Sequence, residues 1–329
     1  MVAHHPLVFV TDKPSISRLL LPRAQLRWPG RALYAVPLNY VGRYEFRYPR
    51  GLTYAELPFT GEPEWRPRAH GNAAPLALLP ASPGVHEAAV AANDLIRYGE
   101  VVYAAEVDHS GAVAFDVLMT EVLGAAAARL PRHRLSILAL DSTSVDAALA
   151  APGSTDDAHF QELLSIGRAR RYFDFCYLVN AQPMLGDALR RVAGAHKDYW
   201  VSKFGLQLLY RLSHLPDITP SGILQLMENW AGHGPQPAIT SLGSAASRHA
   251  IVDQLTQTGL LIESANSSRL QVSTLGTQFL AQLHPDCEDA DLPMRLTRWA
   301  SQWPNSRPNI DRYLRTFFGK QKRFSRRPL

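Results

Sequence analysis

Val101-Val102-Tyr103-Ala104-Ala105-Glu106-Val107-Asp108-His109-Ser110-Gly111-Ala112-Val113 is a run of small and apolar residues interrupted by two acids. Its first five residues predict a strand with both faces covered, as in a parallel sheet. The residues from Ala112 to Leu123 are apolar nearly all round and predict a core helix. A buried strand followed by a core helix indicates an α/β fold.

The two acids, Glu106 and Asp108, follow the predicted strand. At the carboxyl end of a parallel strand they lie at the edge of the sheet where ligands and metals usually bind. They are therefore candidate ligands for a hard cation such as Mg²⁺, which needs only one or two protein carboxylates. The alternative, which spacing alone favours, is a pair of solvated loop acids.

Composition indicates a globular protein with an acidic partner. The 329 residues are enough for two or three domains, and 46% are hydrophobic and 19% charged. The net charge is +5 and most basic residues are arginines, which suit bidentate contacts with phosphates. Two cysteines without a metal-binding or disulfide pattern favour an intracellular location, and no apolar run is long enough to span a bilayer.

The first half of the chain predicts further elements of an α/β domain. Leu7–Val10 and His133–Leu140 predict strands. Asp12 or Ser15 is expected to cap a helix that begins near Pro14. The remaining predictions are a helix over 87–97, a short helix capped by Ser142 and Ser144, and a linker over 151–157.

The second half is predicted to be mainly helical. Arg168, Arg170 and Arg171 fall within one turn and precede aromatic residues, a pattern that can bind phosphates and stack bases, or else form a solvated face. Ser244, Ser247 and the following Arg248 start another predicted helix and can hold a backbone phosphate, or simply cap the helix.

A basic tail follows the last predicted helices. It contains Lys320, Lys322, Arg323, Arg326 and Arg327. Such tails are commonly disordered and add salt-sensitive, non-specific affinity for DNA.

Two of these stretches resemble the acidic motifs of the Toprim domain of type IA DNA topoisomerases. Glu106-Val107-Asp108-His109-Ser110-Gly111-Ala112 is similar to Asp-x-Asp-Arg-Glu-Gly-Glu, but lacks the arginine and both later glutamates. Asp12-Lys13-Pro14-Ser15 is similar to the Glu-Lys-Pro-Ser of the topoisomerase III branch. The resemblance implies a degenerate Mg²⁺ site at Asp12, Glu106 and Asp108, with Lys13 contacting DNA.

The helical half also resembles the base of these topoisomerases. Arg170, Asp174 and Asn180 fit its Arg-x-Arg-x-Asp-Trp helix and later asparagine, and Lys203 stands for an arginine in the next segment. Leu242–Arg248 resembles the Leu-Gly-Thr-Pro-Ala-Thr-Arg helix of its winged-helix-like unit. The resemblance implies DNA contacts at Arg168, Arg170, Lys203, Ser244, Ser247 and Arg248.

The arch domains and the catalytic tyrosine of the family have no counterpart. The chain passes within about a dozen residues, from Arg211 to Thr219, to a helix that follows the arch in the family. Tyr48-Pro49-Arg50 resembles the motif of the nucleophile, but Gly51-Leu52 replaces its Thr-Asp-Ser. Strand passage needs a tyrosine that holds the broken end covalently. The sequence therefore predicts a non-catalytic protein.

The predicted architecture is an α/β Toprim-like domain over 1–150, a helical base domain over 156–235, a winged-helix-like unit with closing helices over 236–318, and the basic tail over 319–329. The predicted function is binding of single-stranded DNA, as a subunit or accessory factor of a larger DNA-processing assembly. The alternatives are a Mg²⁺-dependent Toprim nuclease or primase-like enzyme, and a protein-binding scaffold. The expected location is the cytoplasm, on the nucleoid or a plasmid, with a role in a mobile genetic element as one hypothesis.

Overall fold

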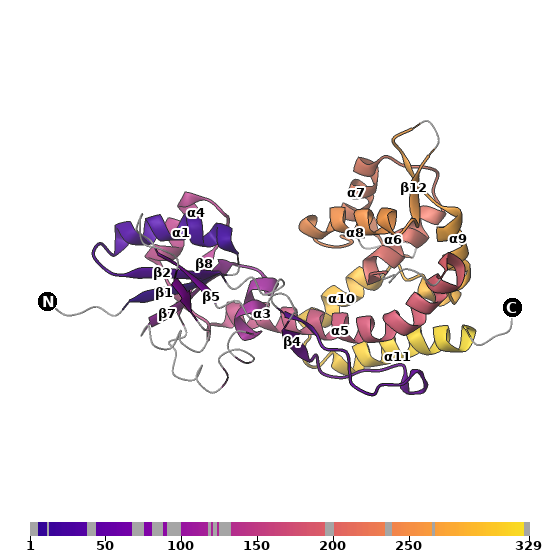
Figure 1. Cartoon of the computed structure of the whole chain (residues 1–329), viewed down its shortest axis with the longest axis horizontal. Coiled ribbons are helices and arrows are strands. Elements are labelled where there is room, and N and C mark those ends of the chain that lie inside the picture. The colour runs from indigo at the N-terminus through magenta and orange to yellow at the C-terminus, as the bar shows by residue number, and fades with distance from the viewer. Residues whose placement is uncertain are drawn as a thin grey trace. The chain divides into compact units, whose positions relative to one another are not determined.

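The structure is a computed structural model that describes residues 6–11, 13–37, 44–67, 76–80, 88–90, 100–117, 120, 124, 133–194, 201–233, 239–264 and 267–325. The chain forms two compact units (Figure 1). The first contains Met1–Arg47 and Glu64–Arg168, and the second contains Tyr48–Pro63 and Ala169–Leu329. The finer division into four parts stays a prediction.

A seven-stranded sheet forms the centre of the first unit, in the order β6-β5-β2-β1-β7-β8-β9. The four central strands are parallel, and the outer strands β5, β6 and β9 run antiparallel to their neighbours. The strands are β1 (Leu7–Thr11), β2 (Leu33–Pro37), β5 (Leu76–Pro80), β6 (Ala88–Val90), β7 (Glu100–Glu106), β8 (His133–Ile137) and β9 (Gly153–Ser154). The predicted sheet is therefore present, and it is mostly parallel.

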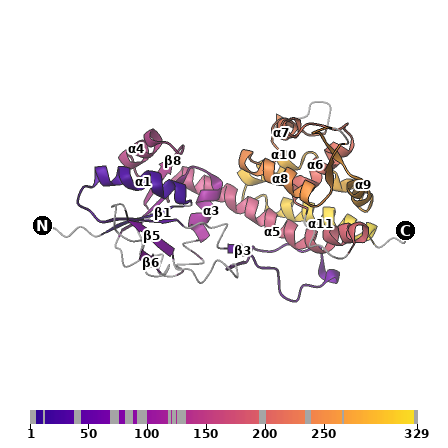
Figure 2. The ribbon, with the colours of Figure 1, turned by 45° about the horizontal axis from the view of Figure 1, so that its top comes forward.

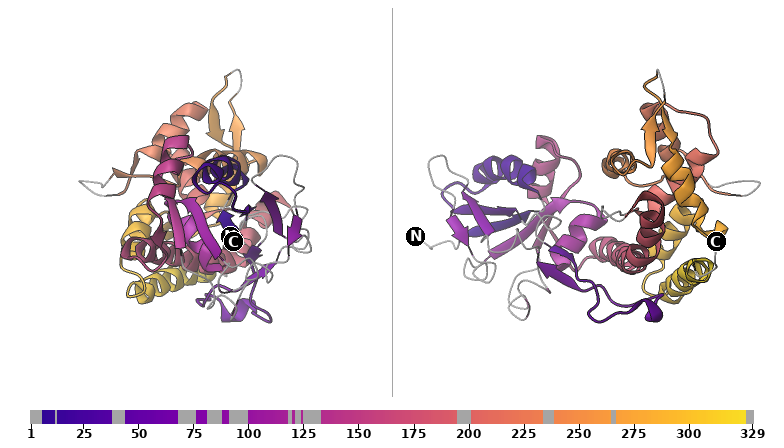
Figure 3. Two further views of the ribbon diagram at one scale, coloured as in Figure 1. Left: turned by 90° about the vertical axis from the view of Figure 1, so that its left-hand side faces the viewer. Right: turned by 45° about the vertical axis from the view of Figure 1, so that its right-hand side comes forward.

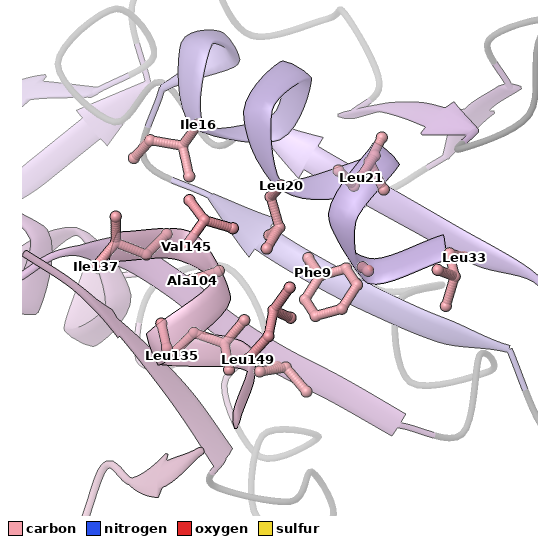
Figure 4. Close-up of a cluster of buried hydrophobic side chains, with 14 of the residues drawn as sticks. Phe9, Ile16, Leu20, Leu21, Leu33, Ala104, Leu135, Ile137, Val145 and Leu149 are labelled. Carbon is pink, nitrogen blue, oxygen red and sulfur yellow. The ribbon is translucent and has the colours of Figure 1, made fainter. Parts of the chain in front are cut away.

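Helices cover both faces of this sheet. Its four helices are α1 (Pro14–Arg27), α3 (His109–Val117), α4 (Ser142–Ala150) and the start of α5 (Ala158–Ala193). α1 and α4 pack on one face around Phe9, Leu20 and Leu149 (Figures 2 and 4), whereas α3 and α5 pack on the other around Val8 and Phe160. Alternate residues of β1 point into the two cores, which explains why central strands are apolar on both faces.

Some sequence predictions for this unit are confirmed and others are wrong. β7 is buried from Val101 to Ala105, as predicted. The helix after it starts at His109, three residues before the predicted Ala112, because Asp108 caps it. The predicted helix over 87–97 is wrong at Ala88–Val90, which pairs with β5 as a strand.

Two further expectations for the first unit fail at helix and domain ends. Asp141, rather than Ser142 or Ser144, caps α4 by accepting a hydrogen bond from the Ser144 amide. The predicted linker contains β9, and Arg134 of β8 makes a two-pronged ion pair with Asp157 at 2.8–3.0 Å. The segment between α4 and α5 is therefore fixed to the sheet.

The second unit is mainly helical. Its helices are the rest of α5, α6 (Lys203–Ser213), α7 (Pro220–Glu228), α8 (Ala245–Gln257), α9 (Thr274–Ala281), α10 (Leu292–Ser301) and α11 (Arg307–Phe324), with short 3₁₀ helices at Tyr54–Glu56 and Pro285–Cys287. α5 and α11 pack through aromatic rings, among them Tyr177 on Phe318 at 5.4 Å between centroids. Two small hairpins complete it, β10 (Trp230–Ala231) with β11 (Ile239–Thr240) and β12 (Leu261–Glu263) with β13 (Leu270–Val272).

The segment Tyr48–Pro63, called the strap below, belongs to the second unit although it connects two strands of the first, β3 (Tyr44–Phe46) and β4 (Trp65–Pro67). It runs along α11 (Figure 3): Glu62 pairs with Arg307, and Lys322 donates to the carbonyls of Ala55 and Leu57 at 2.8 and 2.6 Å. Asn180 of α5 is fully buried and binds both the amide and the carbonyl of Phe59 at 2.7 Å.

In the part of the chain that the structure describes, every helix is too short or too polar to cross a lipid bilayer.

Candidate functional site

The carboxyl edge of the sheet brings the two predicted acidic motifs together. β1 and β7 are parallel neighbours in which Thr11 pairs with Ala104, so the residues just beyond these positions meet at one edge. There the Lys13 ammonium forms an ion pair with the Glu106 carboxylate. Asp12 lies outside the described residues. The proximity of the two motifs, separated by about ninety residues, follows from the strand order and not from local sequence.

Asp108 has a structural role at this edge. Its carboxylate accepts a hydrogen bond from the Gly111 amide at 2.6 Å and so caps α3. A Cβ on Gly111 would lie 3.0 Å from the Tyr103 hydroxyl and 3.1 Å from the Glu106 carbonyl, so this turn has little room for a side chain. Gly111 is therefore needed for the close packing of the helix on β7.

The described residues fit a metal poorly. No group of three or more His, Cys, Asp and Glu side chains among them is close enough to hold an ion. The Lys13 ammonium already occupies the position beside Glu106 where a cation would bind. Mg²⁺ binding by Glu106 and Asp108, together with Asp12, would require Lys13 to move away.

Arg168, a predicted DNA contact, belongs to the first unit. Its guanidinium donates to the Asp116 carboxylate of α3 at 2.7 and 3.2 Å, and half of its side chain is exposed. The preceding Gly167 lets α5 approach α3, because a Cβ there would lie only 2.6 Å from the His109 carbonyl oxygen. Arg168 thus fastens two helices and keeps one exposed side.

Asp174 of α5 gathers basic residues of the second unit. Lys203 at the start of α6 forms an ion pair with it, Arg171 lies 3.8 Å away, and the exposed Arg170 is near. Burial raises the pKa of the Asp174 carboxyl. The positive charges of Lys203, Arg171 and Arg170 lower it by a larger amount, so the pKa is below its ordinary value. The Lys203 ammonium also lies 4.6 Å from the centroid of the Phe204 ring.

The start of α8 is less open than the sequence predicts. The Ser244 hydroxyl donates to the Ser247 hydroxyl at 3.1 Å, and Ser244 makes no side-chain cap. Arg248 is largely buried, with its guanidinium 3.5 Å from Glu228 and its Nε without a hydrogen-bond partner in the described structure. A Cβ on the nearby Gly243 would lie 3.8 Å from Phe204, so the loop before α8 lies against the start of α6.

The structure therefore brings together part of the predicted DNA contacts. Arg170, Lys203 and the Ser244–Arg248 turn belong to the second unit, whereas Lys13 and Arg168 belong to the first. Four of the basic members, Lys13, Arg168, Lys203 and Arg248, each pair with an acid of their own unit. Among the basic members of the set in the second unit, Arg170 is exposed, whereas Lys203 and Arg248 are partly buried.

One basic surface was not among the predicted sites. α11 carries six basic residues and one acid, and an open pocket lies on its exposed face, lined by Pro308, Asp311, Arg312, Arg315, Thr316 and Arg323. The predicted basic tail begins inside this helix, since α11 continues to Phe324. The sequence feature that could have predicted the full helix is the helical spacing of Ile310, Leu314 and Phe317. These residues are buried on one face of α11, and Gln321 extends that face by one turn.

No protein-family model and no curated protein matches the sequence. A similar solved structure is full-length topoisomerase I of Thermotoga maritima, with 16% identity and a TM-score of 0.37. The match covers 63% of this chain and 29% of the topoisomerase, so the chain spans less than a third of that protein's length. At this level the likeness establishes neither a family nor a function.

Proposed function

We propose that the chain is a non-catalytic DNA-binding protein that binds single-stranded DNA as a subunit or accessory factor of a larger assembly. The observation that carries the proposal is the distribution of charge. The second unit contains 20 Lys and Arg against 14 Asp and Glu, whereas the first contains 14 against 15. The whole positive excess therefore belongs to the second unit, which suits a polyanionic ligand.

The motifs of the sequence support the same proposal. The first unit would be a Toprim-like domain, and β1 and β7 with their acidic motifs meet at the edge where such a domain binds metal. The segment from α7 to α9, with the β12–β13 hairpin, would be the winged-helix-like unit. The degenerate acidic motif and the missing arch would make the protein a descendant of type IA topoisomerases without strand passage.

The partners of the two candidate metal ligands support a non-catalytic role. Glu106 forms an ion pair with Lys13, and Asp108 caps α3. A carboxylate that serves as a ligand or general base needs its oxygens available to the metal or the substrate. In this arrangement both acids have structural roles, and we propose that these roles have replaced a catalytic one.

A second candidate is a Mg²⁺-dependent nuclease. It is favoured by the exposure of Asp108 at the carboxyl edge of the sheet, next to the end of β1. In that case Asp12, Glu106 and Asp108 would hold one ion, and its chemistry would be to polarise a phosphate and activate water.

Binding of a fluorescent 30-nucleotide single strand, measured by anisotropy over a salt series with and without Mg²⁺, tests the proposal. We expect salt-sensitive binding that leaves the DNA intact on a gel. Arg170→Ala should weaken binding, whereas Arg18→Ala, an exposed arginine of α1, serves as the matched control. Mg²⁺-dependent cleavage that Asp108→Ala abolishes would instead establish the nuclease, and absence of binding at low salt would favour a protein scaffold.

A further inference from the structure

We infer that the exposed face of α11 is the main phosphate-binding surface of the protein, through Arg312, Arg315, Thr316 and Arg323. The inference rests on the proposed function and names the surface that performs it. These four residues line the open pocket on α11 together with Pro308 and Asp311. They are called the α11 stripe below.

The α11 stripe is built from residues in helical register. Eleven residues separate Arg312 from Arg323, which is close to three full turns, so both side chains project from the same side of the helix. The separation along the axis is about 16 Å, long enough to contact several successive phosphates of one nucleic-acid strand. A row of cations of this length matches a polymer of phosphates better than a single anion.

Two arginines of the α11 stripe differ from four of the basic residues predicted to contact DNA, because those four each pair with an acid. Neither Arg312 nor Arg323 makes a hydrogen bond or ion pair within the described parts of the chain, and both are exposed. Arg315 donates to the Thr60 hydroxyl of the strap at 2.9 Å. In contrast, Lys203 and Arg248, two of the predicted DNA contacts, pair with Asp174 and Glu228. The guanidinium groups of Arg312 and Arg323 are thus available to an external ligand.

The backbone under the α11 stripe is held rigidly. Ile310, Leu314, Phe317 and Phe318 are buried on the opposite side of α11. Gln321 is fully buried, and its side chain accepts from the His284 amide at 2.7 Å and donates to the Gln282 carbonyl at 3.1 Å. A fixed helix presents its arginines in one arrangement, which lowers the entropy cost of binding.

The acid beside the α11 stripe is already engaged. The Asp311 carboxylate accepts a hydrogen bond from the Tyr172 hydroxyl at 2.5 Å, and the Arg307 guanidinium lies 4.8 Å from the Tyr172 ring. Asp311 therefore faces Tyr172 of α5, and the nearby Arg307 offsets part of its negative charge.

The side chains of the α11 stripe also predict that it does not distinguish between DNA bases. Among the described residues that line the pocket none is aromatic, so they provide no platform on which bases could stack. Arginine and threonine bind phosphate oxygens in any sequence. Binding by this surface should therefore be independent of base composition.

The test compares two double variants of the full chain. Arg312→Ala/Arg323→Ala removes two charges from the α11 stripe, and Arg191→Ala/Arg298→Ala removes two exposed charges from α5 and α10 of the same unit. With a 30-nucleotide single strand as the probe, the stripe variant should bind at least about tenfold more weakly at low salt, and the magnitude of its salt slope should fall by about 1.4. The control variant should bind nearly as the unchanged protein does.

Each outcome has one meaning. Equal binding by both variants and the unchanged protein would overturn the inference and leave the proposed function standing. Failure of the unchanged protein to bind DNA would overturn both. An acidic peptide of the same length and charge is the second probe. If it binds as tightly as the DNA and loses affinity in the stripe variant, the surface binds an acidic protein and the assignment to nucleic acid is wrong.

Discussion

The carboxyl edge of the sheet in the first unit and the exposed face of α11 in the second both carry charged side chains, but these side chains differ in how many have partners within their own unit. At the sheet edge, Lys13 pairs with Glu106 and Asp108 caps α3. On α11, Arg312 and Arg323 make no such contacts in the described structure. The difference teaches that residues in a recognisable sequence motif can have structural roles, whereas a helix face without a motif can present charges to a ligand.

Three ion pairs of the molecule are expected to contribute to stability in a graded order, because their charged side chains differ in burial. The basic side chain is 8% exposed in Arg134–Asp157, 18% exposed in Lys203–Asp174 and 49% exposed in Lys13–Glu106. An ion pair and its hydrogen bonds contribute more when the charged groups are shielded from water.

The largest effect is expected at Arg134. Its side chain is 8% exposed and makes three hydrogen-bonding contacts with Asp157, which also accepts from the Phe160 amide at the start of α5. Arg134→Ala should lower the free energy of unfolding by about 2 to 3 kcal/mol, since it removes charge-assisted hydrogen bonds to Asp157 and the contact of a buried guanidinium with the Phe160 ring. Urea unfolding followed by circular dichroism measures this. A loss below about 1 kcal/mol would show that the pair is not stabilising.

Asp174 should show an intermediate effect that depends on pH. Its folded-state pKa lies below the ordinary 3.8, so its stabilising contribution is present above that value and is lost as the pH falls through the lower, folded-state pKa. Asp174→Asn should destabilise the protein by about 1 to 2 kcal/mol at pH 7. Melting temperatures from pH 7 down to pH 3 should converge on those of the unchanged protein. A difference independent of pH would contradict the assignment.

The exposed pair should contribute least among the three. Lys13→Ala should change the free energy of unfolding by less than about 1 kcal/mol, because both side chains are partly solvated. The same variant vacates the position beside Glu106. Isothermal titration with Mg²⁺ should then show whether Lys13 alone prevents binding, with Lys13→Ala/Asp108→Ala as the control.

The smallest effect on stability is expected at the α11 stripe. Arg312→Ala/Arg323→Ala should leave the free energy of unfolding within about 0.5 kcal/mol of the unchanged protein, because both side chains are exposed. A larger loss would mean that these arginines have internal partners, and the contrast between the two regions would disappear.

The sequence predicted the central elements but not their ends. The apolar run Val101–Ala105 identified β7, because a strand covered on both faces has a distinctive composition. The helix predicted over 87–97 failed at Ala88–Val90, where pairing with β5 overrides the helix preference of alanine. The cap of α4 was assigned to Ser142 or Ser144 although Asp141 does it, an error of a few residues typical of helix ends.

The candidate sites were predictable only where they are local. The acids after β7 were found from the sequence, but their partner Lys13 depends on β1 lying beside β7. Arg168, Lys203 and Arg248 were also selected from the sequence as candidate DNA contacts. The acids that pair with Arg168 and Arg248 lie on other helices, so these pairings could not be predicted from the sequence. The α11 stripe was missed because Arg312, Arg315 and Thr316 fall in the predicted closing helices, to which no site was assigned, and Arg323 was placed in the predicted tail.

The strap has a consequence for taking the protein apart. Its residues connect two strands of the first unit but complete the core of the second, where Asn180 and Cys176 bind the backbone of Phe59 and Gly61. A fragment that starts at residue 169 would lack this segment and leave those buried groups without partners. The second unit should therefore fold in isolation only when a peptide covering residues 48–63 is supplied in trans or fused ahead of it.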